Sequence, residues 1–166
     1  MTPMAELLLE LLSEEIPARM QAAAAERLHA ALGEELETAK VETFVAPRRL
    51  VAVVRGLPVR QPDAKESRKG PRIGAPAEAV EAFARSVGLT VADLAIETQK
   101  KGEFYLAHWT RKGRPTAEVL AEKLPDLVRG FAWPKSMRWG SSPVRWVRPL
   151  RRVLCLFNGK PIELDI

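Results

Sequence analysis

The 166-residue sequence has one cysteine and two histidines, and this scarcity argues against several kinds of chemistry. Cys155 has no partner for an internal disulfide, and its place in the apolar run Val153–Phe157 predicts a small buried hydrophobic side chain. Neither His29 nor His108 has a neighbour at the spacing of metal ligands. A zinc site and a Cys/His nucleophile pair therefore have little support.

Long apolar runs are also missing. No stretch approaches the roughly 18 apolar residues of a transmembrane helix, so we expect no membrane partner. The segment Met1–Met4 has no basic region followed by an apolar one, which argues against a secretory signal. These features together favour a cytoplasmic protein.

Familiar catalytic and phosphate-binding motifs do not occur in the sequence. There is no G-x-G-x-x-G, Walker-type, H-E-x-x-H or G-x-S-x-G pattern. Adjacent Glu14 and Glu15 would suit a general acid/base pair. At a predicted helix start, however, they favour interaction with the helix dipole. From the motifs alone, neither a catalytic residue nor a metal site has support, and the chain would be a basic α+β domain of unknown purpose.

What is present is an ordinary globular composition with an uneven distribution of charge. Hydrophobic residues make up 46% and charged residues 28%, as in a folded domain, and the length suits one domain or one domain and a small piece. The net charge of +5 arises from alternating blocks. Acidic residues dominate 1–45 and 76–110, and basic residues dominate 46–75 and 111–166.

Two basic blocks favour a polyanionic partner, because Lys and Arg near phosphates release counterions and steer the encounter. The alternative is a solvated basic surface that balances the acidic one. Arginine predominates in the second block, with Trp133, Trp139 and Trp146 interleaved, and this combination suits nucleic acid. Tryptophans at such spacings are nevertheless more typical of a core than of base-stacking platforms.

The first part of the chain predicts a strand, a helix and two further strands. Glu6–Leu12 predicts a buried strand, and Ser13 is the expected cap of a helix that continues through Met20–Leu36. Val41–Val45 and Leu50–Val54 predict two strands, the second of them interior to its sheet.

The rest of the chain predicts alternating loops, helices and hairpins. Residues 56–76 are rich in proline, glycine and basic side chains and predict a loop. A helix at 76–86, a short helical turn at 90–94 and a hairpin of 95–99 with 104–110 follow. The next elements are a helix at 115–129, kinked or split at Pro125, and a connection at 130–143. The chain then has a strand-like stretch at 144–157 and a hairpin turn at Asn158-Gly159 before 160–166. We expect an α+β fold, with a mixed or mostly antiparallel sheet, a few packed helices and a basic loop at about 56–76.

Six short segments, in order, resemble a known family. They comprise 7–11 with 13–19, 46–50, 68–72 with 74–76, 101–105, 133–140 and 144–150. The most specific is Trp-Pro-Lys-Ser-Met-Arg-Trp-Gly at 133–140. Together they resemble the β subunit of bacterial tetrameric glycyl-tRNA synthetase. One departure is Leu12-Ser13, where the family more commonly has Gly-Thr; Ser13 keeps the hydroxyl expected to cap the helix.

The resemblance implies a division of labour within glycine–tRNA ligase. The α subunit would hold the class II catalytic core, where glycine and ATP, with Mg, form glycyl adenylate. The β subunit would supply most of the recognition of tRNA(Gly), within a tetramer of two α and two β subunits. The family's β subunit is several-fold longer. Residues 1–166 would thus be its N-terminal region, a fragment without the HD-like and anticodon-binding regions, with no cofactor of its own and no activity alone.

The leading hypothesis is a tRNA-binding and subunit-organising region. The candidate tRNA-binding residues are Arg48, Arg49, Arg68, Lys69, Arg72, Lys135, Arg138, Arg145 and Arg148. Each has a structural alternative: Arg48 and Arg49 could pair with the acidic first helix, and Arg145 and Arg148 could form ion pairs within the domain.

A second hypothesis is a structural scaffold that contacts the α or β subunit without touching tRNA, since aromatics with arginine also suit protein interfaces. An editing-like domain is a third. It has the weakest support, because no acid/base or nucleophile set is present.

Overall fold

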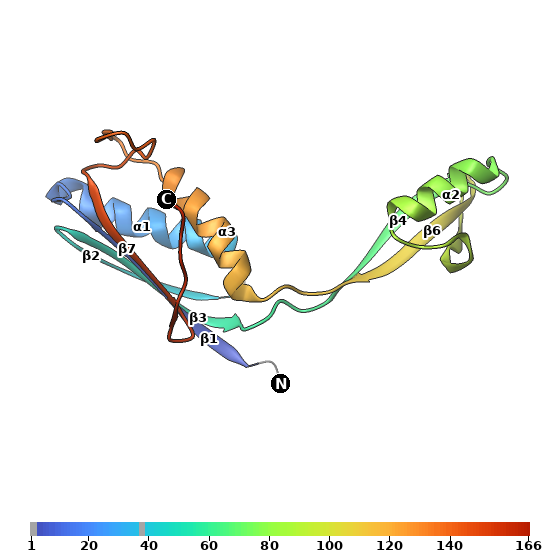
Figure 1. The fold of residues 1–166 in the computed structure, drawn as a ribbon, viewed down its shortest axis with the longest axis horizontal. Helices are drawn as coiled ribbons and strands as arrows, with labels where there is room; N and C mark the ends of the chain where they lie inside the picture. The colour runs from blue at the N-terminus through green and yellow to red at the C-terminus, as the bar shows by residue number, and fades with distance from the viewer. Residues whose placement is uncertain (1–2, 37–38) are drawn as a thin grey trace. The chain divides into compact units, whose positions relative to one another are not determined.

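The computed structural model describes residues 3–36 and 39–166 and divides the chain into two compact units (Figure 1). The large unit combines the chain up to Gln61 with Arg114–Ile166, and the small unit is the intervening Pro62–Gly113. The small unit is therefore an insertion in the sequence of the large one.

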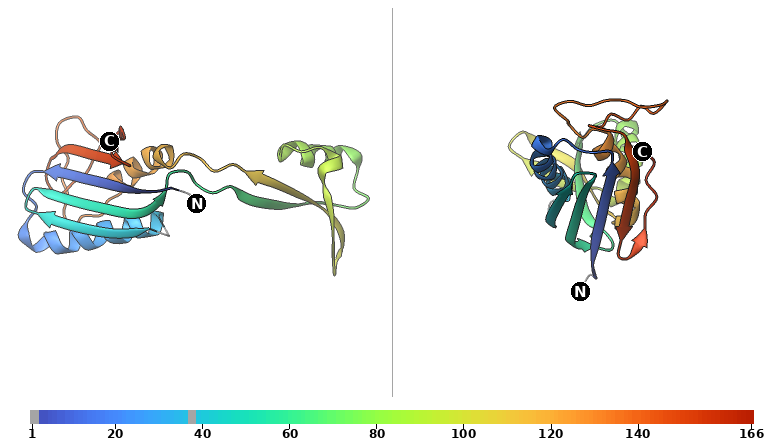
Figure 2. Two further views of the ribbon diagram at one scale, coloured as in Figure 1. Left: turned by 90° about the horizontal axis from the view of Figure 1, so that it is seen from below. Right: turned by 90° about the vertical axis from the view of Figure 1, so that its left-hand side faces the viewer.

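The large unit is built on a five-stranded antiparallel sheet. Its strands are β1 (Met4–Ser13), β2 (Lys40–Ala46), β3 (Arg49–Pro58), β7 (Leu150–Phe157) and β8 (Lys160–Pro161). They lie side by side in the order β2-β3-β1-β7-β8, and Figure 2 shows the four long strands in this arrangement. The predicted strands at 6–12, 41–45 and 50–54 are confirmed, and the last is interior as expected.

Two helices, α1 (Ala18–Glu35) and α3 (Thr116–Arg129), complete the large unit. Without the insertion, its elements follow the order β1-α1-β2-β3-α3-β7. This order, together with the strand order β2-β3-β1-β7, is the split βαβ, or ferredoxin-like, arrangement. Connections of this kind leave one face of the sheet without helices.

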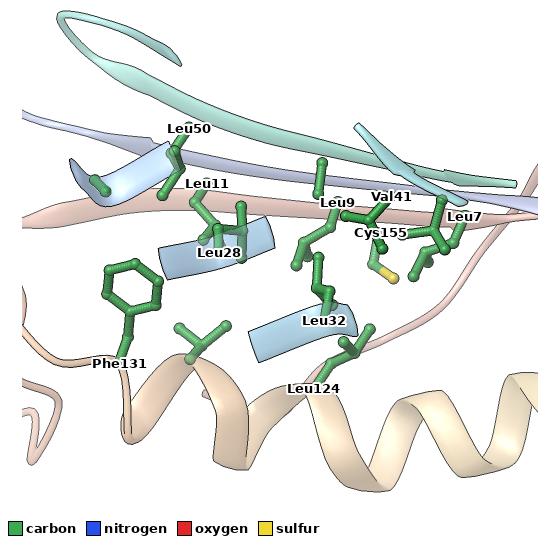
Figure 3. Packing of buried hydrophobic residues seen from close by; sticks show 14 of the residues in the cluster. Leu7, Leu9, Leu11, Leu28, Leu32, Val41, Leu50, Leu124, Phe131 and Cys155 are labelled. Atoms are coloured by element: carbon green, nitrogen blue, oxygen red, sulfur yellow. The ribbon is translucent and has the colours of Figure 1, made fainter. Parts of the chain in front are cut away.

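The core lies between the sheet and the two helices, on one face only. Every second residue of β1 is buried, including Leu7, Leu9 and Leu11, as the period of two along a strand requires. Leu28 and Leu32 of α1 pack against them, and Figure 3 shows both helices on the same side of the strands.

The cap predicted for the first helix is wrong. Ser13 is the last residue of β1 and is 2% exposed, and its hydroxyl donates to the carbonyl oxygen of Glu14 at 2.8 Å. The alternation that buries Leu11 also buries Ser13, so its side chain points into the core. The residue preceding α1 is Pro17, which makes no side-chain capping hydrogen bond.

The small unit has a three-stranded antiparallel sheet in the order β4-β6-β5. The strands are β4 (Ala64–Arg72), β5 (Ala95–Gln99) and β6 (Gly102–Arg111). They are accompanied by the helix α2 (Ala77–Ser86) and the 3-10 turn η1 (Val91–Asp93). The hairpin predicted at 95–110 and the helix predicted at 76–86 are confirmed.

The loop predicted at 56–76 is wrong. β3 continues to Pro58, and Ala64–Arg72 form β4, which pairs with β6. Because β6 supplies hydrogen bonds from a distant part of the sequence, β4 forms in spite of its low intrinsic β propensity. The ladder is irregular between Lys69 and Arg72, where Pro71 has no N–H to donate.

Later elements agree with the sequence except at their limits. The helix predicted at 115–129 is present as α3, but the split expected at Pro125 is wrong, because α3 runs without interruption through this buried proline. The predicted strand at 144–157 begins only at Leu150. Asn158 and Gly159 both have positive φ, 51° and 75°, as a two-residue hairpin turn requires. The fold is α+β as predicted, with three α-helices and two antiparallel sheets in the described residues. None of the helices in the described ranges combines the length and hydropathy needed to cross a membrane.

Substituting neighbouring leucines of β1 tests the one-sided core. Leu9→Ala removes a side chain that is 0% exposed and leaves a cavity, so the free energy of unfolding should fall by about 3 kcal/mol. Leu8→Ala, on the opposite face, should cost less than about 1.5 kcal/mol. Urea unfolding of the two variants measures the difference, and equal losses would contradict burial on one face alone.

The buried thiol predicts an alkaline loss of stability. Burial raises the pKa of Cys155 to about 11. Between pH 9 and 11 the unfolded chain releases this proton and the folded chain retains it. The free energy of unfolding should therefore fall by about 1 kcal/mol per pH unit in this window. Cys155→Ala should lack this component, and identical pH profiles for the two proteins would disprove it.

Candidate nucleic-acid interface

The tryptophans of the second basic block belong to the core. Trp146 is fully buried, and its ring centroid lies 5.0 Å from that of Trp133. The ring centroid of Phe131 lies 5.1 Å from the ring centroid of each of these tryptophans. Trp139 is partly buried against the same core. These rings anchor the connection between α3 and β7, and the expectation that they are core residues is confirmed.

Four candidate cations lie on this connection and point to solvent. Lys135, Arg138, Arg145 and Arg148 are all exposed. Arg145 donates to the hydroxyl of Ser136 at 3.3 Å, and Arg148 to the carbonyl oxygen of Val147 at 2.9 Å. Within residues 3–36 and 39–166, none of the four forms an ion pair. The structure thus shows no internal ion pair for Arg145 or Arg148.

Arg48 and Arg49, in contrast, have carboxylate partners. Arg48 lies in the turn between β2 and β3, and its guanidinium is 3.4 Å from Glu14. Arg49 begins β3 and is 3.5 Å from Glu10. Their partners come from β1 and the segment after it, so the expected pairing with the acidic first helix is wrong in its location. Arg151 also binds Glu14, at 2.6 Å, and was not predicted.

The candidates on β4 are divided between the two faces of the small sheet. Arg68 is opposite Ala107, whereas Lys69 is opposite Leu106 and Arg72 is opposite Phe104. Ala107 is fully buried, and the exposed fractions of Val80 and Ala84 of α2 are no more than 5%. α2 therefore covers the face of the small sheet on which Arg68 and Ala107 lie. The side chains of Lys69 and Arg72 lie on the other face.

Lys69 and Arg72 converge on one aromatic ring. The ammonium nitrogen of Lys69 lies 3.6 Å from the ring centroid of Phe104 and donates to Oε1 of Gln99 at 2.7 Å. The guanidinium carbon of Arg72 is 5.9 Å from the same centroid, and Arg72 donates to the carbonyl oxygen of Lys101. The ring holds both cations in place by cation–π attraction without neutralising their charge.

We call Lys65, Lys69, Arg72 and Phe104 the basic face. Its three cations are exposed, and none of them pairs with a carboxylate among the residues that the structure describes. Lys100 and Lys101 follow in the adjoining β5–β6 turn. The basic face thus offers positive charge, and an anionic ligand does not have to break an ion pair to reach it.

Acid/base chemistry finds little support in the geometry. The pKa of Glu42 is lowered by hydrogen bonds from Lys40 and Arg55, and the pKa of Asp93 by hydrogen bonds from Thr90. Both carboxylates lie on the surface in structural contacts. The described part of the chain contains no group of three or more His, Cys, Asp or Glu side chains placed to hold a metal ion. The arrangement is suited to binding anions.

Comparison with known proteins places the chain in a family. The profile described as "Glycyl-tRNA synthetase beta subunit" matches residues 7–166. The chain belongs to this family. The glycine–tRNA ligase β subunit of Ruegeria sp. (strain TM1040) is 46% identical over 173 residues, covering 98% of this chain and 25% of the relative. That of Phenylobacterium zucineum (strain HLK1) is 49% identical over 169 residues, with the same coverage. The chain spans about a quarter of the length of these relatives.

A double-mutant cycle tests the contact at the centre of the basic face. Lys69→Met and Phe104→Leu each remove one partner of the cation–π pair, and their effects on the stability of the small unit should be coupled by about 0.5–1 kcal/mol. Lys65→Met with Phe104→Leu serves as the control, because Lys65 lies opposite Thr110, and its coupling should be near zero. Amide hydrogen exchange of β6 provides the measurement. Equal coupling in the two cycles would mean that the ring does not hold Lys69.

Proposed function

We propose that this chain takes part in attaching glycine to tRNA(Gly) and contacts the tRNA through the basic face of the small unit. Membership of the β-subunit family supports the reaction. The observation that carries the contact is the convergence of Lys69 and Arg72 on Phe104, with no carboxylate partner among the described residues.

The physical basis is attraction to the phosphate backbone. An exposed ammonium and a guanidinium, fixed by a ring and by a backbone carbonyl, lose little side-chain entropy when a phosphate binds. Each phosphate contact releases counterions, which makes the affinity dependent on salt. Arg68 lies on the opposite face of the same strand and is a separate candidate.

The α subunit would supply the chemistry in this proposal, and ATP, Mg and glycine would bind there. The site geometry of the present chain is consistent with this division, since its arrangement favours binding over acid/base catalysis. The assembly would be the tetramer of two α and two β subunits.

The large unit supports a second, structural role. Arg48 and Arg49 are engaged by Glu14 and Glu10, and the tryptophans are in the core. A phosphate at Arg48 or Arg49 would have to compete with these carboxylates. We therefore propose that the large unit is mainly a scaffold, with the exposed cations of residues 135–148 as further tRNA contacts.

Neutralising matched pairs of cations separates the two roles. Lys69→Gln/Arg72→Gln, in the β subunit assembled with its α subunit, should weaken tRNA binding about tenfold at low salt. It should also reduce the slope of log affinity against log salt by about 1.5.

The control is Arg48→Gln/Arg49→Gln, which removes the same charge from ion-paired positions and should change the affinity less than about threefold. Filter binding at several salt concentrations measures both. An unchanged slope in the first variant removes the basic face from the interface, and a larger loss in the control moves the interface to the β2–β3 turn.

A further inference from the structure

The face of the five-stranded sheet opposite the helices is apolar. The alternation along β1 and β3 places Leu8, Leu12, Val51 and Val53 on it, and the ladders add side chains from the neighbouring strands. Phe44 of β2 is 55% exposed and Leu154 of β7 is 38% exposed. We define the apolar face as Leu8, Leu12, Phe44, Val51, Val53, Leu154 and Leu156. Exposed apolar patches of a few hundred Å² on a protein surface are often functional.

The charged groups that border the apolar face are almost all paired with one another. Arg55 binds Glu6 at 2.8 Å and Glu42 at 3.0 Å, and Lys40 is 3.2 Å from Glu42. Within the face itself, Glu10 lies between Val51 and Leu154 and is paired with Arg49 at 3.5 Å. The positive and negative charges of these pairs cancel one another.

Arg152 is different. The ladder places it opposite Leu12, on the same face as Leu154. Its side chain is exposed, and no carboxylate among residues 3–36 and 39–166 pairs with it. The apolar face thus carries one unbalanced positive charge, at the edge where β1 ends and β7 begins.

The chemistry of the two central strands argues against RNA as the occupant. Four-stranded RNA-recognition sheets stack bases on aromatic side chains of their exposed face. Here β1 and β3 present leucine and valine, and Glu10 stands in the middle of the face. A nucleic acid would meet a carboxylate and no ring on these strands.

The size of the face argues against a second copy. The four long strands lie about 4.8 Å apart, and each contributes about seven residues with a rise of about 3.4 Å per residue. The face therefore covers roughly 450 Å². Stable interfaces bury about 800 Å² per partner. A helix is about 10 Å wide, and the opposite face of the same strands already holds α1 and α3. The apolar face has the dimensions for one or two further helices.

We propose that the apolar face docks an amphipathic helix of a partner protein, whose apolar stripe covers the patch and whose carboxylate pairs with Arg152. This interaction is independent of the basic face and of tRNA. The apolar stripe provides the affinity, and the ion pair fixes the direction of the helix.

Two synthetic peptides test the proposal on the 166-residue chain. Each is an amphipathic helix of about 16 residues, long enough to span about 24 Å, with leucines on one face. One carries two glutamates at one end of the stripe, and the other carries two lysines there. Fluorescence anisotropy should give at least about tenfold tighter binding of the glutamate peptide. Arg152→Glu, at an exposed position, should reverse the preference.

Leu154→Glu should weaken both peptides about tenfold, whereas Ile96→Glu, at a 60% exposed apolar residue of the small unit, should weaken neither. Circular dichroism confirms that each variant folds. Equal affinity for the two peptides, or a preference that Arg152→Glu leaves unchanged, overturns the proposal. A dimer of the chain that Leu154→Glu dissociates would assign the face to a second copy, and binding of an RNA oligonucleotide that Leu154→Glu abolishes would assign it to nucleic acid.

Discussion

The structure of the large unit depends on β1, which hydrogen-bonds to β3 on one side and to β7 on the other. The ladder with β7 joins the beginning of the described chain to the segment Leu150–Phe157, near its end. Because the side chains of a strand alternate, this one strand also separates a face covered by helices from a face without them. Leu7, Leu9 and Leu11 are buried in the core between the sheet and the helices, and Leu8 and Leu12 belong to the apolar face. Both the stability of the unit and its proposed docking surface follow from this arrangement.

The arginines differ in what surrounds them. Sequence alone treats Arg48, Arg49 and Arg72 as equivalent cations, yet Glu14 and Glu10 hold the first two and an aromatic ring holds the third. A carboxylate partner reduces the field that a phosphate experiences, whereas a ring restrains the cation and leaves its charge available. The small unit is therefore the better candidate for contact with tRNA, although the large unit has the longer list of basic residues.

Much of the fold could be predicted, because its strands and helices are encoded locally. The alternation at 6–12, the β-branched run at 50–54 and the Asn158-Gly159 turn each specify their structure within a few residues. β4 could not be found in this way, because its strand depends on hydrogen bonds from β6, and its own glycine, proline and lysine residues indicate a loop. The misplaced cap at Ser13 has a similar cause: β1 extends one residue further than its leucines indicate.

The candidate site was predicted in composition but not in geometry. Lys69 and Arg72 were named, but the register that separates them from Arg68 requires the partner strand. Arg151 and Arg152 were missed, and the adjacent arginines following Pro149-Leu150 were the available signal. Their different roles, one bound to Glu14 and one open on the apolar face, depend on which side of β7 each occupies.

The two ends of the insertion are joined within the large unit. The N–H of Gln61 donates to the carbonyl oxygen of Arg114 at 2.9 Å, and the N–H of Thr116 donates to that of Val59 at 3.0 Å. The chain therefore leaves and re-enters the large unit through one pair of adjacent backbones. A closed loop of this kind adds an entropy cost that grows only with the logarithm of its length. The small unit can thus change in size or sequence during evolution while the strand order of the large unit is preserved, so the proposed tRNA contact and the proposed scaffold can diverge at independent rates.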